Sequence, residues 1–137
     1  MNEEIIEGGC LCGAVRYRAS GTPYDVTHCH CVLCRRASGA PFVSWASFRS
    51  AHFSFTIGEP VRFASSARAV RTFCNRCGTP LTFQLHEKAD EVDVTIGSMD
   101  DPERVIPQDH TWTRSQLSWI KLADELPCYV TTRLKDE

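Results

Sequence analysis

The spacing of the cysteines constrains this chain more than any other feature of its sequence. Seven of its eight cysteines form three short motifs, C-x-C, C-x-C-x-x-C and C-x-x-C, at Cys10 and Cys12, at Cys29, Cys31 and Cys34, and at Cys74 and Cys77. Residues 1–4 are acidic and no apolar segment follows, so we expect neither a signal peptide nor a membrane span, and a cytoplasmic location. Clustered cysteines in that reducing compartment indicate metal binding or catalysis rather than disulfides.

Two of the motifs together make one complete tetrahedral site. Structural zinc takes four ligands, commonly from paired short motifs. The two doublets supply four sulfurs, whereas adding the triplet to either doublet would give five ligands. The simplest partition therefore predicts a closed structural zinc site at Cys10, Cys12, Cys74 and Cys77. A mononuclear iron at this site stays open as an alternative.

Each doublet is followed by a glycine, Gly13 or Gly78. A metal-binding knuckle bends sharply at this point, where a residue free to take a positive φ fits most easily. The glycine also lets backbone N–H groups approach the sulfurs. An ion held by both knuckles would join the first strand to the middle of the chain, so its loss is expected to unfold much of the domain.

The triplet Cys29, Cys31 and Cys34 has no fourth cysteine nearby. Three protein ligands with one open position describe a catalytic or ligand-exchanging zinc. In an extended backbone His28 and His30 point away from the face that carries Cys29 and Cys31, which makes the two histidines poor ligands for the same ion. The eighth cysteine, Cys128, is expected to be buried as a small hydrophobe, and it remains the rival for the fourth position.

The charge composition argues against a nucleic-acid partner. The chain carries 15 Lys and Arg against 17 Asp and Glu, a net charge of −2, with no concentrated basic patch. The pair Arg35 and Arg36 beside the triplet is compatible with solvated arginines, with compensation of thiolate charge, or with binding of a substrate carboxylate.

Short alternating runs at 14–18, 53–57, 70–73, 81–85 and 92–96 predict strands with one buried face, separated by Gly- and Pro-rich turns. This pattern is typical of an antiparallel all-β protein, and no linker divides residues 1–137, so we expect a single domain with its core at about 8–129. Helix signals are scarce. One turn is expected at 35–37, and another near 98–104, with Asp101 as its cap and Pro102 in its first position. Trp45, Trp119 and the phenylalanines are expected in the core or at its edge.

Four longer motifs, at 8–17, 28–40, 71–81 and 97–102, resemble the glutathione-dependent formaldehyde-activating enzyme family, which includes centromere-protein-V-like domains. The C-terminal part agrees with the same family at Pro107, His110, Trp112, Trp119 and 126–129. The resemblance implies an all-β tent of sheets similar to Mss4-type chaperones. It also implies two zinc ions per chain, one bound by the two doublets and one by the triplet near the substrate site.

The family's activity is formation of S-hydroxymethylglutathione from glutathione and formaldehyde, which is a carbon–sulfur lyase reaction in the reverse sense. The resemblance therefore implies a small thiol such as glutathione as partner, and the candidates for the pocket are Arg35, Arg36, His110 and Trp112. For His110 and Trp112 the alternative is packing of a loop over the core. The rival function is a non-catalytic zinc module that binds a protein or a small thiol, and the sequence leaves the oligomeric state open.

Overall fold

The computed structural model describes residues 4–133, so residues 1–3 of the acidic start and the last four residues lie outside the described part. Within it, ten strands form two sheets. The strands are β1 (Ile5–Gly9), β2 (Arg16–Ser20), β3 (Tyr24–Cys29), β4 (Val43–Arg49), β5 (Phe53–Ile57), β6 (Val61–Ser66), β7 (Ala69–Phe73), β8 (Pro80–Leu85), β9 (Glu91–Thr95) and β10 (Asp109–Thr111). One α-helix, α1 (Val32–Ser38), and five 3₁₀ turns complete the described residues: η1 (Ser50–His52), η2 (His86–Lys88), η3 (Ile96–Ser98), η4 (Pro102–Arg104) and η5 (Thr113–Ser115).

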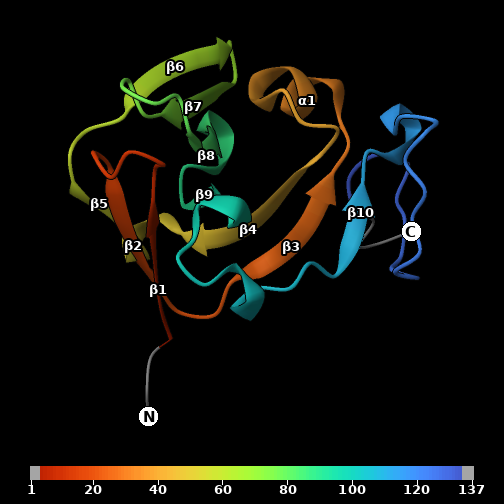
Figure 1. The fold of residues 1–137 in the computed structure, drawn as a ribbon, viewed down its shortest axis with the longest axis horizontal. Coiled ribbons are helices and arrows are strands. Elements are labelled where there is room, and N and C mark those ends of the chain that lie inside the picture. The colour runs from red at the N-terminus through yellow and green to blue at the C-terminus, as the bar shows by residue number, and fades with distance from the viewer. Residues whose placement is uncertain (1–3, 134–137) are drawn as a thin grey trace.

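The smaller sheet has the order β1-β2-β5, and the larger one β10-β3-β4-β9-β8-β7-β6. Figure 1 shows the small sheet at one side of the molecule and β10 at the opposite side. The expected all-β class is confirmed, and all but one of the strand pairs are antiparallel among the described residues. The exception is β3–β10, whose strands run parallel with His110 opposite His28. A strand of three mostly polar residues has too short a pattern to reveal its partner in the sequence.

The core lies between the two sheets because each sheet turns one apolar face inward. In β2 the side chains of Tyr17 and Ala19 are buried while Arg18 between them is exposed, as the period of two requires. The large sheet contributes Phe48, Leu81 and Val94, all almost inaccessible to solvent. Burial of each large apolar side chain contributes about 1.5–3 kcal/mol.

Two turns differ from the expectation. The helix after the triplet begins earlier and runs longer than one turn, because Cys31 caps it: the Cys31 sulfur accepts the Cys34 N–H at 3.2 Å. At η4 Pro102 does take the first position, but Asp101 makes no capping hydrogen bond with its side chain, so the predicted cap is wrong. The Asp101 backbone (φ −128°, ψ 76°) is outside the extended geometry usual for a capping residue.

The core prediction holds for Trp45, which is buried, and fails for Trp119 and Phe63, which are 64% and 56% exposed. Phe63 lies on β6, which forms one edge of the large sheet and has mostly exposed residues. In the described part of the chain, no helix is long and apolar enough to cross a membrane.

Candidate metal centre

The two cysteine doublets meet where the two sheets come together. Cys10 and Cys12 lie in the turn between β1 and β2, and Cys74 and Cys77 lie in the turn between β7 and β8. The Sγ atoms of Cys10 and Cys12 are 3.7 Å apart, those of Cys12 and Cys74 are 3.8 Å apart, and all four lie within 4.8 Å of one another. Four converging sulfurs from two knuckles are a donor set suited to a tetrahedral zinc ion.

The glycines after both doublets have the backbone expected of them. Gly13 and Gly78 each have φ +82°, a left-handed conformation that residues with a Cβ rarely adopt. At the first knuckle the Val15 N–H donates to the Cys10 sulfur at 3.3 Å, and at the second the Arg76 N–H donates to the Cys74 sulfur at the same distance. These bonds fix the sulfurs and stabilise negative charge on them.

The surroundings of Cys77 favour its thiolate form. The Thr79 hydroxyl lies 3.2 Å from the Cys77 sulfur, and with the backbone N–H groups of Thr79 and Cys12 it lowers the pKa of Cys77 to about 5. The same Thr79 hydroxyl accepts the Leu11 N–H at 3.1 Å, so it contacts both knuckles. A thiolate is the form that binds a metal ion, and this environment favours it.

The triplet forms a second, separate set. Cys29 ends β3, Cys31 caps α1 and Cys34 lies in the first turn of that helix, and their three Sγ atoms lie within 4.8 Å of one another. The contacts with Cys29 and Cys34, together with the backbone N–H of Cys34, lower the pKa of Cys31 to about 2. The contacts with Cys31 and Cys34 raise the pKa of Cys29, so the three thiols titrate as one coupled group.

Aromatic side chains enclose the triplet. Cys29 and Cys34 form one buried cluster with Trp45, against which Phe83 and Trp112 pack. Trp112, a candidate from sequence, therefore lies at the triplet.

The three arginines near the triplet differ in their surroundings. Arg36 is exposed on α1. The Nε of Arg35 is buried and has no hydrogen-bond partner among residues 4–133. Arg71 was missed from sequence: its Nη2 lies 3.9 Å from the Cys34 sulfur, and its guanidinium covers the Phe83 ring at 4.7 Å. The signal available for Arg71 was its place in a strand that runs directly into the second knuckle.

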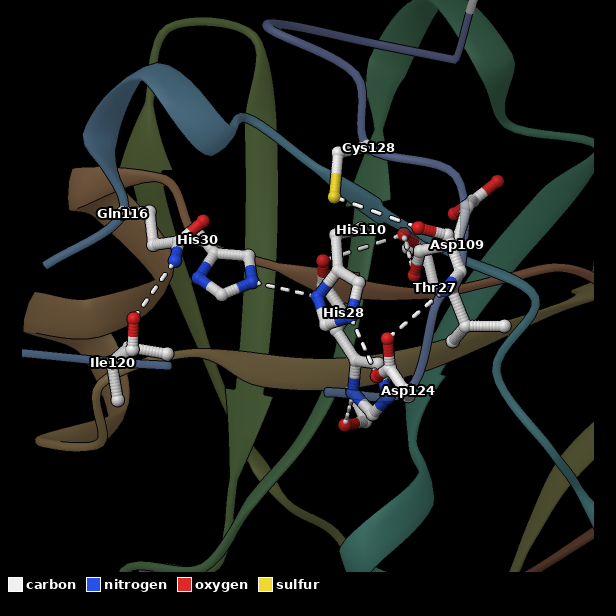
Figure 2. A network of polar contacts seen from close by, with 11 residues as sticks. Thr27, His28, His30, Asp109, His110, Gln116, Ile120, Asp124 and Cys128 are labelled. Atoms are coloured by element: carbon white, nitrogen blue, oxygen red, sulfur yellow. Dashed lines mark hydrogen bonds and ion pairs between the residues drawn. The ribbon is translucent and has the colours of Figure 1, made fainter. Parts of the chain in front are cut away.

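The histidines lie on a chain of polar contacts beside the triplet. His30 Nε2 lies 2.9 Å from His110 Nδ1, and His110 Nε2 lies 2.8 Å from an Asp124 carboxylate oxygen (Figure 2). His30 and His110 are almost completely buried. Burial, with the neighbouring His110, lowers the pKa of His30 to about 4, and the His110 contact lowers the pKa of Asp124.

Neither His28 nor His30 belongs to the group of converging triplet sulfurs. His28 instead places Nδ1 2.7 Å from the Ser44 hydroxyl, on the face of β3 that alternation assigns to it. Cys128 is also outside the triplet: it is exposed, and its sulfur donates to the Leu126 carbonyl at 3.6 Å. The prediction that Cys128 is buried is therefore wrong, because it lies in the irregular segment that bridges to His110 at the edge of the sheet.

The fold and the two sulfur sets define a cysteine-rich β protein with two sites that can bind metal ions. Residues 5–115 match the family model for glutathione-dependent formaldehyde-activating enzymes, and the chain belongs to this family.

Similar proteins agree with that assignment. An uncharacterized lyase of Schizosaccharomyces pombe is 37% identical over 78 residues, which cover 56% of this chain and 56% of that protein, little more than half of each. A protein of Halomonas elongata, provisionally named a glutathione-dependent formaldehyde-activating enzyme, is 27% identical over 135 residues, which cover 86% of this chain and 81% of that protein. A crystal structure of a Rhodobacter sphaeroides protein has the same fold, with a TM-score of 0.54 and 22% identity over 89% of this chain and 98% of the other.

Proposed function

We propose that this protein is a zinc-dependent carbon–sulfur lyase that acts on the adduct of a small thiol with an aldehyde, S-hydroxymethylglutathione being the leading candidate. The observation that carries the proposal is the contrast between four converging sulfurs at the knuckles and three at the triplet. The family, and the names of the two relatives, support a lyase that involves glutathione and formaldehyde.

In this proposal each chain has two zinc ions. Cys10, Cys12, Cys74 and Cys77 would hold the structural ion, and Cys29, Cys31 and Cys34 would hold the second. Zinc with three thiolates and one open position supplies a place where an incoming thiol binds and gives up its proton. A cytoplasmic location, where glutathione and reduced cysteines coexist, is part of the proposal.

The reaction balances without an oxidant or a reductant. In the synthetic direction the thiol sulfur bonds to the aldehyde carbon, the carbon–oxygen π bond breaks, and the oxygen takes up the proton that left the thiol. The lyase direction reverses each change. The chain's part is to hold the thiol sulfur and the aldehyde carbon together, which removes most of the entropic cost of a bimolecular step.

Arg35 and Arg71 are the residues we assign to the carboxylates of the thiol. Glutathione has two carboxylates at neutral pH, and arginine is the side chain best suited to bind them in a fork. Arg35 has a buried Nε without a partner among the described residues, and Arg71 lies beside the Cys34 sulfur. Arg36 is exposed and has no such role in this proposal.

The aromatic wall formed by Trp45, Phe83 and Trp112 excludes water from one side of the triplet. Electrostatic interactions between arginine and carboxylate are stronger where water is excluded. Trp112 is held in place by its backbone, since its N–H donates to the Thr131 carbonyl at 2.8 Å, and Arg114 covers its ring at 5.1 Å.

The test is an NMR measurement of exchange between glutathione, formaldehyde and their adduct, with wild type compared with Cys31→Ser. Serine is a preferred helix cap, so Cys31→Ser should retain α1 while removing one sulfur of the triplet. Cys128→Ser, outside both sulfur sets, is the matched control. We expect faster exchange with wild type and with the control, and the uncatalysed rate with Cys31→Ser. A wild type that does not exceed the uncatalysed rate overturns the lyase, and thiol binding without acceleration would instead support a non-catalytic zinc module.

A further inference from the structure

Three metal-ligand side chains outside both sulfur sets converge at the end of the large sheet. They are His28 on β3, His110 on β10 and Asp124 in the segment that follows η5. We propose that these three residues form a third metal site, which binds Zn²⁺ through two imidazole nitrogens and one carboxylate oxygen. This inference does not depend on the lyase activity or on the two cysteine sites.

The pairing of β3 with β10 brings the two imidazoles together. His110 lies opposite His28 in the parallel register, so the two side chains leave the same face of the sheet. Their rings stack with centroids 4.7 Å apart and planes inclined by 27°. A ring nitrogen of His28 and one of His110 lie within 4.8 Å of each other, close enough for one ion to be reached from both rings.

The carboxylate of Asp124 supplies the third ligand atom. Asp124 Oδ2 lies 2.8 Å from His110 Nε2, and one ligand atom from each of the three residues lies within 4.8 Å of the others. Figure 2 shows the carboxylate facing both imidazole rings. Zinc ligands in a tetrahedral site lie closer together than 4.8 Å, so small rotations of the side chains complete the geometry.

The contacts behind the ligands are of the kind that orient metal-binding side chains. Histidine ligands usually hold their second nitrogen in a hydrogen bond. His28 does so through Nδ1 and the Ser44 hydroxyl at 2.7 Å, and His110 through Nδ1 and His30 Nε2 at 2.9 Å. Asp124 is held too, since its Oδ1 accepts the Leu126 N–H at 3.1 Å.

Each residue therefore keeps an atom for the ion. His28 Nε2 makes no hydrogen bond to any residue in the part of the chain that the structure describes. Among residues 4–133, the one contact that an ion must replace is the hydrogen bond between His110 and Asp124. The Asp124 side chain is 40% exposed, which gives an ion access from solution.

The donor set distinguishes zinc from magnesium and calcium. Imidazole and carboxylate together suit zinc, whereas magnesium and calcium prefer oxygen ligands alone. Two neutral imidazoles and one carboxylate leave a Zn²⁺ ion with a net positive charge and at least one open position. The triplet, with three thiolates, leaves a net negative charge. The third site would accordingly take a water molecule or an anion where the triplet takes a thiol.

The experiment uses the full chain with its thiolate sites already loaded with zinc. Zn²⁺ is then added while the imidazole nitrogens are followed by ¹⁵N NMR, and its affinity is measured by competition with a chromophoric chelator. We expect the His28 and His110 nitrogens to shift together with one further equivalent of zinc. Asp124→Asn and His28→Gln should each lower the affinity for this further zinc ion by about 10-fold or more. This is the scale on which metal sites respond to loss of supporting groups.

Glu125→Gln, which removes a neighbouring exposed carboxylate, is the matched control and should leave the affinity unchanged. Two results overturn the proposal. One is the absence of an imidazole shift in wild type when zinc is added, and the other is an affinity for the further zinc ion that is the same in Asp124→Asn as in wild type. The first result is obtained on wild type, so it decides the question even if a variant fails to fold. Absence of lyase activity would bear on the triplet alone.

Discussion

The sulfur of Cys12 lies 3.8 Å from the sulfur of Cys74, although the two cysteines are 62 positions apart and extend from strands of different sheets. Cys12 follows β1 of the small sheet, and Cys74 follows β7 of the large one. The apolar core between the sheets is thus bordered by a set of four sulfurs that can bind a metal ion and that comes from both sheets. Stability and metal binding should therefore be linked in this chain, and unequally at the two cysteine sites.

The substitution Cys74→Ser is expected to unfold most of the protein. A structural zinc contributes about 10–16 kcal/mol of apparent binding free energy, which matches or exceeds the whole stability of a typical domain, about 5–15 kcal/mol. Thermal unfolding followed by near-ultraviolet circular dichroism measures the effect, with Cys31→Ser and Cys128→Ser as controls that should keep a cooperative transition. A Cys74→Ser protein that melts within a few degrees of wild type would contradict the structural role of this set.

Arg35 and Arg71 should affect the affinity for the substrate, whereas Arg36 should not. A hydrogen bond to a charged group contributes about 1.5–3 kcal/mol, so we expect Arg35→Ala and Arg71→Ala each to raise KM for the glutathione adduct by about 10-fold or more. Arg36→Ala, one position away on the exposed side of α1, is the control and should leave KM unchanged. Steady-state kinetics at several substrate concentrations separates KM from kcat. Equal effects of all three substitutions would argue for general charge compensation instead.

Asp93 makes the stability of the fold depend on pH. Burial raises the pKa of Asp93 from 3.8 to about 6, while the Ser47 hydroxyl donates to its carboxylate at 2.6 Å. Between about pH 4 and pH 6 the folded protein keeps a proton that the unfolded chain releases, so stability falls as the pH rises through this range. Asp93→Asn cannot ionise, so it removes this fall in stability with rising pH. Its side-chain oxygen can still accept the hydrogen bond from Ser47. The variant should therefore be more stable than wild type above pH 6, with the difference shrinking toward pH 4.

Urea unfolding at several pH values measures that difference. Asp90→Asn is the control, because the Asp90 side chain forms an exposed ion pair with Arg49 at 3.4 Å and such pairs contribute little. A difference between Asp93→Asn and wild type that stays constant from pH 4 to pH 7 would show that the Asp93 carboxylate does not carry the effect.

Gly8 and Gly97 should respond in opposite ways to a methyl group. A Cβ on Gly8 would meet the Tyr17 hydroxyl and lie 2.5 Å from the Ser98 carbonyl oxygen, whereas a Cβ on Gly97 would have no heavy atom within 4 Å. Gly8→Ala should destabilise by about 1–3 kcal/mol or more, as expected of overpacking in a core. Gly97→Ala should be neutral or should stabilise the fold by up to about 1 kcal/mol, because alanine lowers the conformational entropy of the unfolded chain. Equal unfolding free energies for the two variants would refute the close approach at Gly8.

Local features of the fold were predictable from sequence. Alternation predicted the strands around Tyr17 and Val94, because the pattern of buried residues repeats every two positions. The positive φ of Gly13 and Gly78 followed from the sharp bend of a knuckle. The motifs were also sufficient to recognise the family, which the match over residues 5–115 confirms.

Features that depend on distant parts of the chain were not predictable. The parallel pairing of β10 with β3 joins His110 to His28 across 82 positions, and no local pattern records such a contact. Asp124 comes to His110 through an irregular segment. Arg71 looked like an ordinary polar residue on a strand, since its approach to Cys34 depends on how α1 lies over the sheet. The exposure of Cys128 and Trp119 has the same origin, because irregular segments carry no periodicity from which burial could be inferred.

The Cys31 sulfur accepts the Cys34 N–H at the start of α1, so the backbone positions this sulfur independently of any ion. Under the proposed function, loss of an ion at the triplet would leave the first turn of this helix capped, whereas loss of an ion at the knuckles would remove a link between two sheets. If the proposed function is correct, a cell that runs short of zinc and loses the ion at the triplet would keep a stock of folded, inactive protein. That stock would regain its activity when the supply returns, without new synthesis.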